Sequence, residues 1–322
     1  MIKNCKGLSN HIVMNIKNIT LATFVMLASV NAMGQVTDTA DLMNSLEKEV
    51  AAERNADYTL ATFKTTRLVN GHTVENVGKG VLDVKISHRF GTFNKGGYEL
   101  FGLDNATMRM GLDYGITPYL MAGIGRSTYQ KTYDAFFKIK ILRQSSGKRN
   151  MPVTLSYIPT MALKTLHFEN PDRKNYYSSR LFFTHQLLIA RKFSANSSIQ
   201  LMPTLIHRNL SASQEDPNDI LAIGIGARQK LTKRLSLNVE YYYQLPRHKI
   251  DSSTNSLSIG IDIETGGHVF QLHFTNSIGL TERTFIADNT GKWGKGDILF
   301  GFNISRVFNI GKKGIPFKPR VN

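Results

Sequence analysis

The stretch Val81–Phe90 reads VLDVKISHRF, and its side chains alternate between two characters. The apolar side chains fall on one face of an extended chain, and they are Leu82, Val84, Ile86 and Phe90. The charged or polar ones fall on the other face, and they are Asp83, Lys85, Ser87 and Arg89. Because successive side chains of a strand point to opposite faces, this stretch predicts a two-faced β-strand.

The same alternation recurs along the chain in about twelve segments, each with one apolar and one polar face. They begin near residues 80, 106, 119, 132, 151, 179, 197, 220, 233, 255, 268 and 296. Each covers about ten residues, which is long for an ordinary strand but fits a tilted strand that crosses a membrane. Short turns such as Thr117-Pro118 alternate with longer polar loops such as 278–295, as in outer-membrane barrels.

This pattern predicts an all-β chain, a closed antiparallel transmembrane β-barrel of about twelve strands. Lipid offers no water to free backbone N–H and C=O groups, so only a sheet without edges is stable there. A soluble β-sandwich or lipocalin-like barrel also alternates and is the alternative, although its edge strands and corners would interrupt the pattern. An even strand number places both chain ends on the periplasmic side, where the turns are short.

The composition excludes several other classes of protein. The chain has 322 residues, a formal net charge of +16 and a single cysteine. One cysteine excludes a disulfide-stapled domain and a zinc site built from cysteine pairs. Hydrophobic residues make up 41% of the chain, too many for a disordered protein. The mean hydropathy of -0.21 argues against a helical membrane bundle.

The first 34 residues have the pattern of a secretory signal peptide. Lys17 precedes a short apolar run, Ile19–Val30, and the small residues Ala32 and Gly34 follow it. The run is too short to cross a bilayer as a helix, and a buried helix of a soluble domain is the alternative. We expect cleavage after Ala32 or Gly34, which also removes Cys5.

The rest of the chain divides into three parts. Residues 35–79 are expected to form a short N-terminal, periplasmic helix over Asp38–Arg54, followed by an extension at 57–79 that plugs the barrel or adds a strand. Residues 80–310 form the barrel, and 311–322 form a basic C-terminal tail. The N-terminal segment is also where we expect a periplasmic partner to bind.

The predicted inward faces carry charges of both signs. The candidate lumen-facing charged residues are Asp83, Lys85, Arg89, Arg109, Asp113, Asp134, Lys138, Lys140, Arg208, Arg228, Glu240, Asp262 and Glu264. Charges in such a wall tend to pair across strands, so one interpretation is a salt-bridged, closed interior. A modest basic excess suits an anion-selective pore instead, and the sequence leaves both interpretations open.

Three stretches carry a family resemblance. They are Phe63–Val69 (FKTTRLV) with Asn70-Gly71-His72, Gly267–Ser277 (GHVFQLHFTNS) and Gly296–Phe308 (GDILFGFNISRVF). With them the chain resembles an outer-membrane β-barrel family of unknown function from Bacteroidota-type bacteria, over roughly residues 60–310. The resemblance implies an outer-membrane barrel and supplies no catalytic or binding residues.

The sequence predicts no catalytic, cofactor-binding or metal-binding residues. None of the nine histidines is followed two positions later by serine, the pair that barrel phospholipases place on one face of a strand. His248, His268 and His273 lack metal-ligand spacing. The loop acids Glu215 and Asp216 are more simply solvated residues than a protease pair.

The basic residues form no single patch, so we expect no nucleic-acid partner. Basic loop residues would instead face membrane lipid and lipopolysaccharide, and they include Arg247, Lys249, Lys292 and Lys295. We therefore expect a protein of the bacterial outer membrane that is not an enzyme. A passive, porin-like channel or accessory envelope component of unknown substrate is the first interpretation. A non-conducting barrel that binds or supports a partner through its loops is the second, and an outer-membrane hydrolase is the third.

Overall fold

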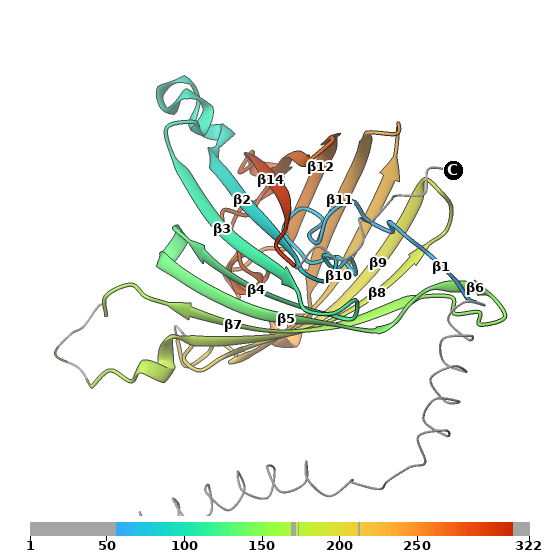
Figure 1. Ribbon diagram of the computed structural model, residues 1–322. Helices are drawn as coiled ribbons and strands as arrows, with labels where there is room; N and C mark the ends of the chain where they lie inside the picture. The colour runs from blue at the N-terminus through green and yellow to red at the C-terminus, as the bar shows by residue number, and fades with distance from the viewer. Residues whose placement is uncertain (1–55, 169–171, 173, 212, 312–322) are drawn as a thin grey trace, which may run out of the picture. The chain divides into compact units, whose positions relative to one another are not determined.

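The computed structural model describes residues 56–168, 172, 174–211 and 213–311. In it, twelve antiparallel strands close into one barrel (Figure 1). The barrel strands are β2 (Val81–Thr92), β3 (Ala106–Gly115), β4 (Leu120–Ser127), β5 (Thr132–Leu142), β7 (Thr154–Lys164), β8 (Leu181–Lys192), β9 (Ser197–Arg208), β10 (Asp219–Lys230), β11 (Leu235–Gln244), β12 (Ser256–Thr265), β13 (His268–Thr275) and β14 (Leu299–Asn309).

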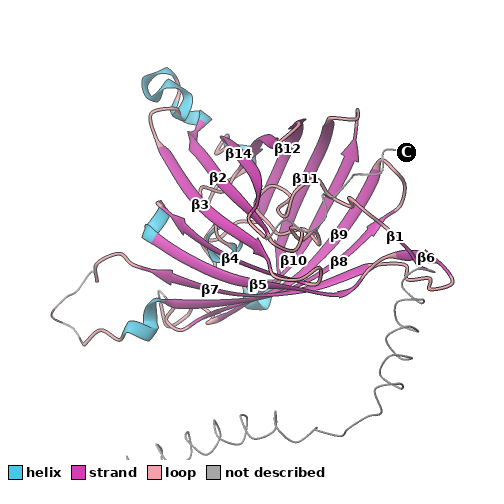
Figure 2. Cartoon of the chain, viewed as in Figure 1, coloured by secondary structure: helices cyan, strands magenta, loops and turns pink. Residues whose placement is uncertain are grey.

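Each barrel strand pairs with the strands that precede and follow it in the barrel, and β14 returns to pair with β2. The strands begin within about three residues of the predicted positions, because the two-residue period fixes where a two-faced strand starts and stops. The predicted closed antiparallel barrel is confirmed. Short and long connections lie at opposite ends, and the long ones carry short helical turns (Figure 2). These are η1 (Phe93–Lys95), η2 (Gly97–Gly102), η3 (Tyr129–Lys131), η4 (Tyr177–Arg180), η5 (Pro246–His248) and η7 (Trp293–Lys295).

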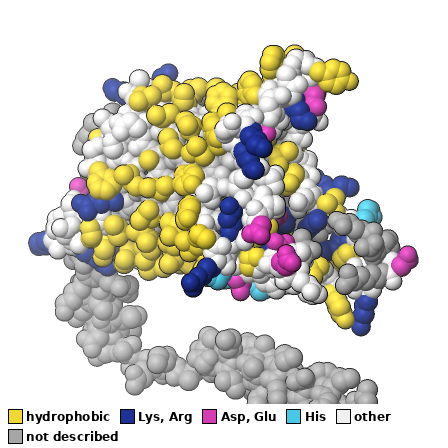
Figure 3. Space-filling model, turned by 180° about the vertical axis from the view of Figure 1, so that it is seen from behind, with side chains coloured by type: hydrophobic (Ala, Val, Ile, Leu, Met, Phe, Trp, Pro, Cys, Tyr) yellow, Lys and Arg dark blue, Asp and Glu magenta, His cyan; other side chains and the backbone are white. Residues whose placement is uncertain are grey.

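The outer wall of the barrel is apolar and much of the inner wall is polar, the reverse of a soluble protein. Leu112 and Ile139 on the outer face are 42% and 39% exposed, whereas Lys138 on the inner face is fully buried. Figure 3 shows apolar side chains gathered over the wall that faces the viewer. Such a continuous apolar surface is stable against hydrocarbon but not against water. Within the described part of the chain, no helix is long and apolar enough to cross a membrane.

Two segments enter the barrel from opposite ends. From the short-turn end comes the chain between β1 (Ala56–Tyr58) and β2, drawn in blue within the barrel in Figure 1. β1 itself pairs with β6 (Ser145–Gly147), outside the barrel sheet. From the long-loop end, the connection between β13 and β14 turns inward and forms a short π-helix, η6 (Arg283–Ala287), all of whose residues are buried.

The two inserted segments share an apolar core with the inner wall. Phe63, Leu68, Val74 and Val77 of the first segment, and Phe285, Ile286 and Ala287 of η6, cluster with wall residues Met121, Phe136, Ile158, Leu188, Met202, Ile206, Ile220 and Tyr242. The expectation of polar side chains inward on every strand is therefore wrong for part of the wall. Those inner positions meet apolar side chains of the inserted segments rather than water, so burial favours apolar residues there.

Several predicted parts lie outside the described residues. They are the signal peptide over 1–34, the helix over 38–54, and all but the first residue of the tail over 311–322.

Candidate functional site

Residues 66–73, in the segment between β1 and β2, form a hairpin inside the lumen. Leu68 donates its N–H to the Gly71 carbonyl over 2.8 Å, and Thr73 donates its N–H to the Thr66 carbonyl over 3.0 Å. Asn70-Gly71, a strong tight-turn dipeptide, lies at the tip. A Cβ atom at Gly71 would collide with the Tyr242 hydroxyl. The turn sequence therefore suits both the hairpin and its close approach to β11.

One carboxylate of the wall receives the tip of the hairpin. Glu240, on β11, is 1% exposed. Its carboxylate accepts the backbone N–H groups of Val69 at 3.3 Å, Asn70 at 3.1 Å and Gly71 at 2.9 Å. Three converging N–H donors compensate a buried negative charge in the way that a backbone anion nest does.

One ammonium group on β5 binds the two legs of the hairpin. Lys138 Nζ donates to the carbonyl oxygens of Thr66 at 3.0 Å, Thr73 at 2.8 Å and Glu75 at 2.9 Å. These are all three donors that a lysine ammonium has. The charge of Lys138 is thus stabilised by the backbone of the inserted segment rather than by a carboxylate of the wall.

Other wall side chains bind the same segment along its length. Arg228 donates to the carbonyls of Ala61 and Thr62 at 3.2 Å each. Gln200 both accepts from the Val74 N–H at 2.9 Å and donates to the His72 carbonyl at 2.7 Å. On the opposite wall, Arg89, Gln271 and Asn303 donate to Asn70, Leu68 and Val69. The lumen side chains are therefore arranged around this segment.

Five of the remaining wall charges pair with one another, in two clusters on β2, β3 and β5. Lys85 Nζ lies 2.6 Å from Asp113 Oδ2 and 3.4 Å from Asp83 Oδ2. Arg109 binds both carboxylate oxygens of Asp134, with Nε 2.9 Å from Oδ1. Such pairs are stable in a wall of low polarity because neither charge is left alone.

All thirteen sequence-predicted charged residues lie on barrel strands, at the following levels of exposure. The buried ones are Asp83, Lys85, Arg89, Arg109, Asp113, Asp134, Lys138, Arg208, Arg228, Glu240 and Asp262, whereas Lys140 and Glu264 are half-buried. Glu264 pairs with Lys64 of the N-terminal segment, and Asp262 accepts from Gln271 at 2.6 Å. The structure thus groups most of the set around the inserted hairpin, and it places Arg208 apart, at the long-loop end.

Sequence reasoning missed the loop that closes the lumen from the long-loop side. Glu282, in that loop, is 1% exposed and pairs with Arg67 of the hairpin. Phe285 packs edge-on against Tyr242 with 5.3 Å between ring centroids. A signal existed, because Phe285–Ala287 is an apolar run within a connection that otherwise has the composition of a polar loop.

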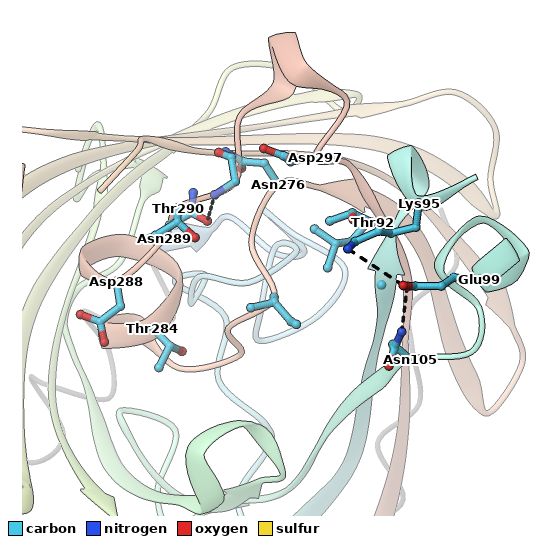
Figure 4. Close-up of a pocket in the computed structure, with 14 residues that line it drawn as sticks. Thr92, Lys95, Glu99, Asn105, Asn276, Thr284, Asp288, Asn289, Thr290 and Asp297 are labelled. Atoms are coloured by element: carbon cyan, nitrogen blue, oxygen red, sulfur yellow. Dashed lines mark hydrogen bonds and ion pairs between the residues drawn. The ribbon is translucent and has the colours of Figure 1, made fainter. Parts of the chain in front are cut away.

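The inserted loop separates two vestibules at the long-loop end. The first, shown in Figure 4, has a volume of about 460 Å³ and carries three acids, Glu99, Asp288 and Asp297, against Lys95. Glu99 accepts from Asn105 at 3.0 Å and lies 4.0 Å from Lys95. We call it the acidic vestibule. In the part of the chain that the structure describes, no group of three or more His, Cys, Asp or Glu side chains could hold a metal ion.

The second vestibule is larger, at about 960 Å³. Its walls carry four cations, Lys164, Arg180, Arg208 and Arg283, and one carboxylate, Asp288. We call it the basic vestibule. In outer-membrane barrels the short turns face the periplasm and the long loops face the exterior, so both vestibules open outward.

Three solved barrels illustrate what the fold is similar to. The NanC porin has a TM-score of 0.43 and 8% identity, with 70% of this chain and 98% of that chain covered. The KdgM porin has a TM-score of 0.41 and 9% identity, with 71% and 99% covered. The outer membrane protein Omp33 of Acinetobacter baumannii has a TM-score of 0.39 and 8% identity, with 70% and 97% covered. At such identities the similarity concerns the fold alone.

No curated protein matches the chain in sequence. A family match, in contrast, extends over residues 63–308, from the first leg of the lumen hairpin to the last barrel strand. The matched span includes the barrel strands and both inserted segments. With its apolar outer wall and closed sheet, this protein of the bacterial outer membrane belongs to the family described as membrane-bound β-barrel domain, DUF5777.

Proposed function

We propose that the protein is an outer-membrane channel that its own N-terminal segment closes in this conformation. The observation that carries the proposal is the way in which wall side chains bind the backbone of residues 61–75. Glu240 and Lys138 together bind six of its backbone groups, from opposite strands. A wall built only for structure would pair its charges with one another, as Arg109 and Asp134 do.

The space that the hairpin occupies is large enough for a pathway. Its two legs lie side by side, joined by the Thr73–Thr66 backbone hydrogen bond. Paired chains are about 5 Å apart, so removal of both legs leaves a passage roughly 10 Å wide up to the inserted loop, which then also loses its ion pair with Arg67. The wall around that passage carries Lys85, Arg89, Lys138, Arg228 and Glu240, among others. Such a passage would accept small hydrophilic solutes with a modest preference for anions.

Withdrawal of the hairpin toward the periplasm would exchange most of its contacts for hydrogen bonds to water. Water can replace a neutral hydrogen bond at a net cost of about 0.5–1.5 kcal/mol, and one to a charged group such as Glu240 or Lys138 at about 1.5–3 kcal/mol. The apolar side chains Phe63, Leu68 and Val74 oppose withdrawal, since they leave the shared core. We therefore expect a channel that is closed at rest.

Conductance in planar bilayers tests the proposal. We would compare the full chain with a variant in which residues 62–76 are replaced by a Gly/Ser linker of equal length. The full chain should be almost silent, whereas the variant should show stable single-channel steps. A matched control replaces residues 93–103, a rim loop outside the lumen, and should stay silent. The folded state of each variant is checked by the heat-dependent shift of the barrel on gel electrophoresis.

A non-conducting barrel that binds a partner is the second candidate. The inward turn of η6 favours it, because the lumen is then closed from both ends. A correctly folded linker variant that passes no current would remove the channel proposal and leave this second one. In either case we propose that the protein is not an enzyme and that lipid and lipopolysaccharide surround its loops.

A further inference from the structure

The basic vestibule has an unbalanced set of charges. It lies between the β4–β5, β7–β8 and β9–β10 loops and the inserted loop. Arg283 is paired, because its Nη1 lies 2.6 Å from Asp288 Oδ2. Within the described ranges, no carboxylate lies within ion-pairing distance of Lys164, Arg180 or Arg208. Among the described residues, three cations of this cavity therefore have no carboxylate paired with them.

Two of the guanidinium groups are buried although their hydrogen-bonding capacity is not filled. Arg208 and Arg283 are each 5% exposed. Arg208 donates from Nη2 to the Pro217 carbonyl at 2.6 Å, and its Nε has no partner. The Nε of Arg283 also lacks a partner. A buried guanidinium N–H group without a hydrogen-bond partner destabilises the protein. A hydrogen-bond acceptor that enters the vestibule would therefore offset part of this destabilisation.

Aromatic rings hold two of the arginines in place. The guanidinium carbon of Arg180 lies 3.6 Å from the ring centroid of Phe168, and that of Arg283 lies 4.1 Å from the ring centroid of Phe182. Stacking on a ring fixes the plane of a guanidinium and leaves its edge N–H groups free to bind an anion. The arginines are thus ordered before any ligand arrives, which lowers the entropy cost of binding.

We propose that the basic vestibule is a binding site for a soluble polyanion whose charged groups are carboxylates or phosphates. The planar N–H pairs of arginine match both groups. A cavity of about 960 Å³ lies in the range of pockets that enclose whole ligands. The site opens toward the exterior at the barrel mouth, so its ligand comes from the surrounding medium. Binding there does not depend on conduction, and the proposal stands apart from the channel.

Titration calorimetry of the purified full chain in detergent tests this site. The probes are tripolyphosphate and citrate, with maltotriose as an uncharged comparison. The wild-type protein should bind both anions and not maltotriose, and the affinity should fall as salt is added. Arg180→Gln and Arg208→Gln should each weaken binding roughly tenfold, the loss of one charge-assisted partner. Arg208→Lys should recover only part of the affinity, because lysine lacks the planar donor pair.

The matched control is Lys95→Gln, which removes a cation from the acidic vestibule across the inserted loop and should keep wild-type affinity. Arg180 lies in a loop, so its variant tests the site even where Arg208→Gln disturbs the barrel. Absence of anion binding at millimolar concentration, or an equal loss with Lys95→Gln, would overturn the proposal. Displacement of citrate by added lipopolysaccharide would also overturn it, because the site would then belong to a lipid headgroup.

Discussion

Arg67 Nη1 lies 3.0 Å from Glu282 Oε1, and this ion pair joins the segment that enters from the short-turn end to the loop that enters from the long-loop end. Both side chains are more than nine-tenths buried. Their positions differ by 215 residues in the sequence. The two closures of the lumen are therefore one connected structure rather than two independent ones.

The first prediction concerns this ion pair. Arg67→Met or Glu282→Leu alone leaves one buried group without its partner and should destabilise the folded barrel by about 3–5 kcal/mol. The double variant Arg67→Met/Glu282→Leu should recover most of that loss, because apolar side chains replace a buried ion pair at little cost. Unfolding in denaturant, monitored by the heat-dependent gel shift, measures the loss of stability in the single variants and its recovery in the double variant. Additive losses in the double variant would show that the pair does not couple the two segments.

The second prediction concerns Lys138. Lys138→Met removes three hydrogen bonds to the hairpin, and at ~1.5 kcal/mol or somewhat less for each it should weaken the seating of the hairpin by roughly 3 kcal/mol. On the channel proposal, the open probability in planar bilayers should rise by about two orders of magnitude, since each 1.4 kcal/mol is tenfold. Lys140→Met is the matched control. Lys140 lies on the same strand, and among the described residues it makes no hydrogen bond to the hairpin. Equal behaviour of the two variants would contradict the assigned role of Lys138.

The third prediction concerns Gly71. An alanine there would press its Cβ against the Tyr242 hydroxyl, with Glu240 Oε2 3.2 Å away. Overpacking of this kind costs about 1–3 kcal/mol, so Gly71→Ala should loosen the hairpin and expose residues 61–77 to added protease. Gly97→Ala, in a rim loop with nothing within 4 Å of its Cβ, should leave cleavage at wild-type rate. If residues 61–77 of the Gly71→Ala variant stayed fully protected from the protease, the tip of the hairpin would not lie against Tyr242.

The fourth prediction concerns pH. Burial holds the pKa of His72, a residue of the hairpin, well below its usual 6.5. Nearby cations lower it further, and they are Arg67, Lys138, Lys85 and Arg109. Glu282 is the acid that faces this ring, with Oε1 3.4 Å from Nε2. The seated hairpin therefore holds neutral His72, whereas a withdrawn hairpin takes up a proton near pH 6.5.

The sign of the pH effect follows from that difference. Above pH 6.5, His72 is neutral in both forms and the seated hairpin keeps its full stability. As the pH falls below 6.5 the seated form loses stability relative to the withdrawn form, because only the withdrawn form binds the proton. Open probability should therefore rise as the pH is lowered from 7 to 5. His72→Gln should remove this local part of the response. An unchanged pH profile in that variant would assign the response to other groups.

The barrel itself was predictable because its determinants are local. The alternation in Val81–Phe90 and its repeats depends only on a strand having one face in lipid, so the strand starts agree closely with the structure. The same alternation predicted that charges such as Lys85 and Lys138 lie on the inner face. The partners of the inward-facing charges were not predictable from the sequence. Glu240, for example, binds backbone groups that lie some 170 residues away, and no local sequence pattern indicates such a contact.

The inner wall shows where period-two reasoning fails. Along β8, Leu188 faces inward although its neighbours Leu187 and Ile189 are also apolar, so the pattern there does not distinguish the two faces. The cause is the apolar core contributed by Phe63, Leu68 and η6. The basic vestibule was equally hidden, because Arg180 and Arg283 lie in loops whose sequence has no period. Their convergence depends on the folded barrel.

Hydrogen exchange of residues 61–77 in the protein embedded in lipid tests the central claim most directly. If the hairpin is seated in the lumen, the amides of Val69, Asn70 and Gly71, which donate to Glu240, should exchange as slowly as those of the adjoining barrel strands. Exchange of this peptide at the rate of a free chain, beside protected barrel strands, would contradict the account.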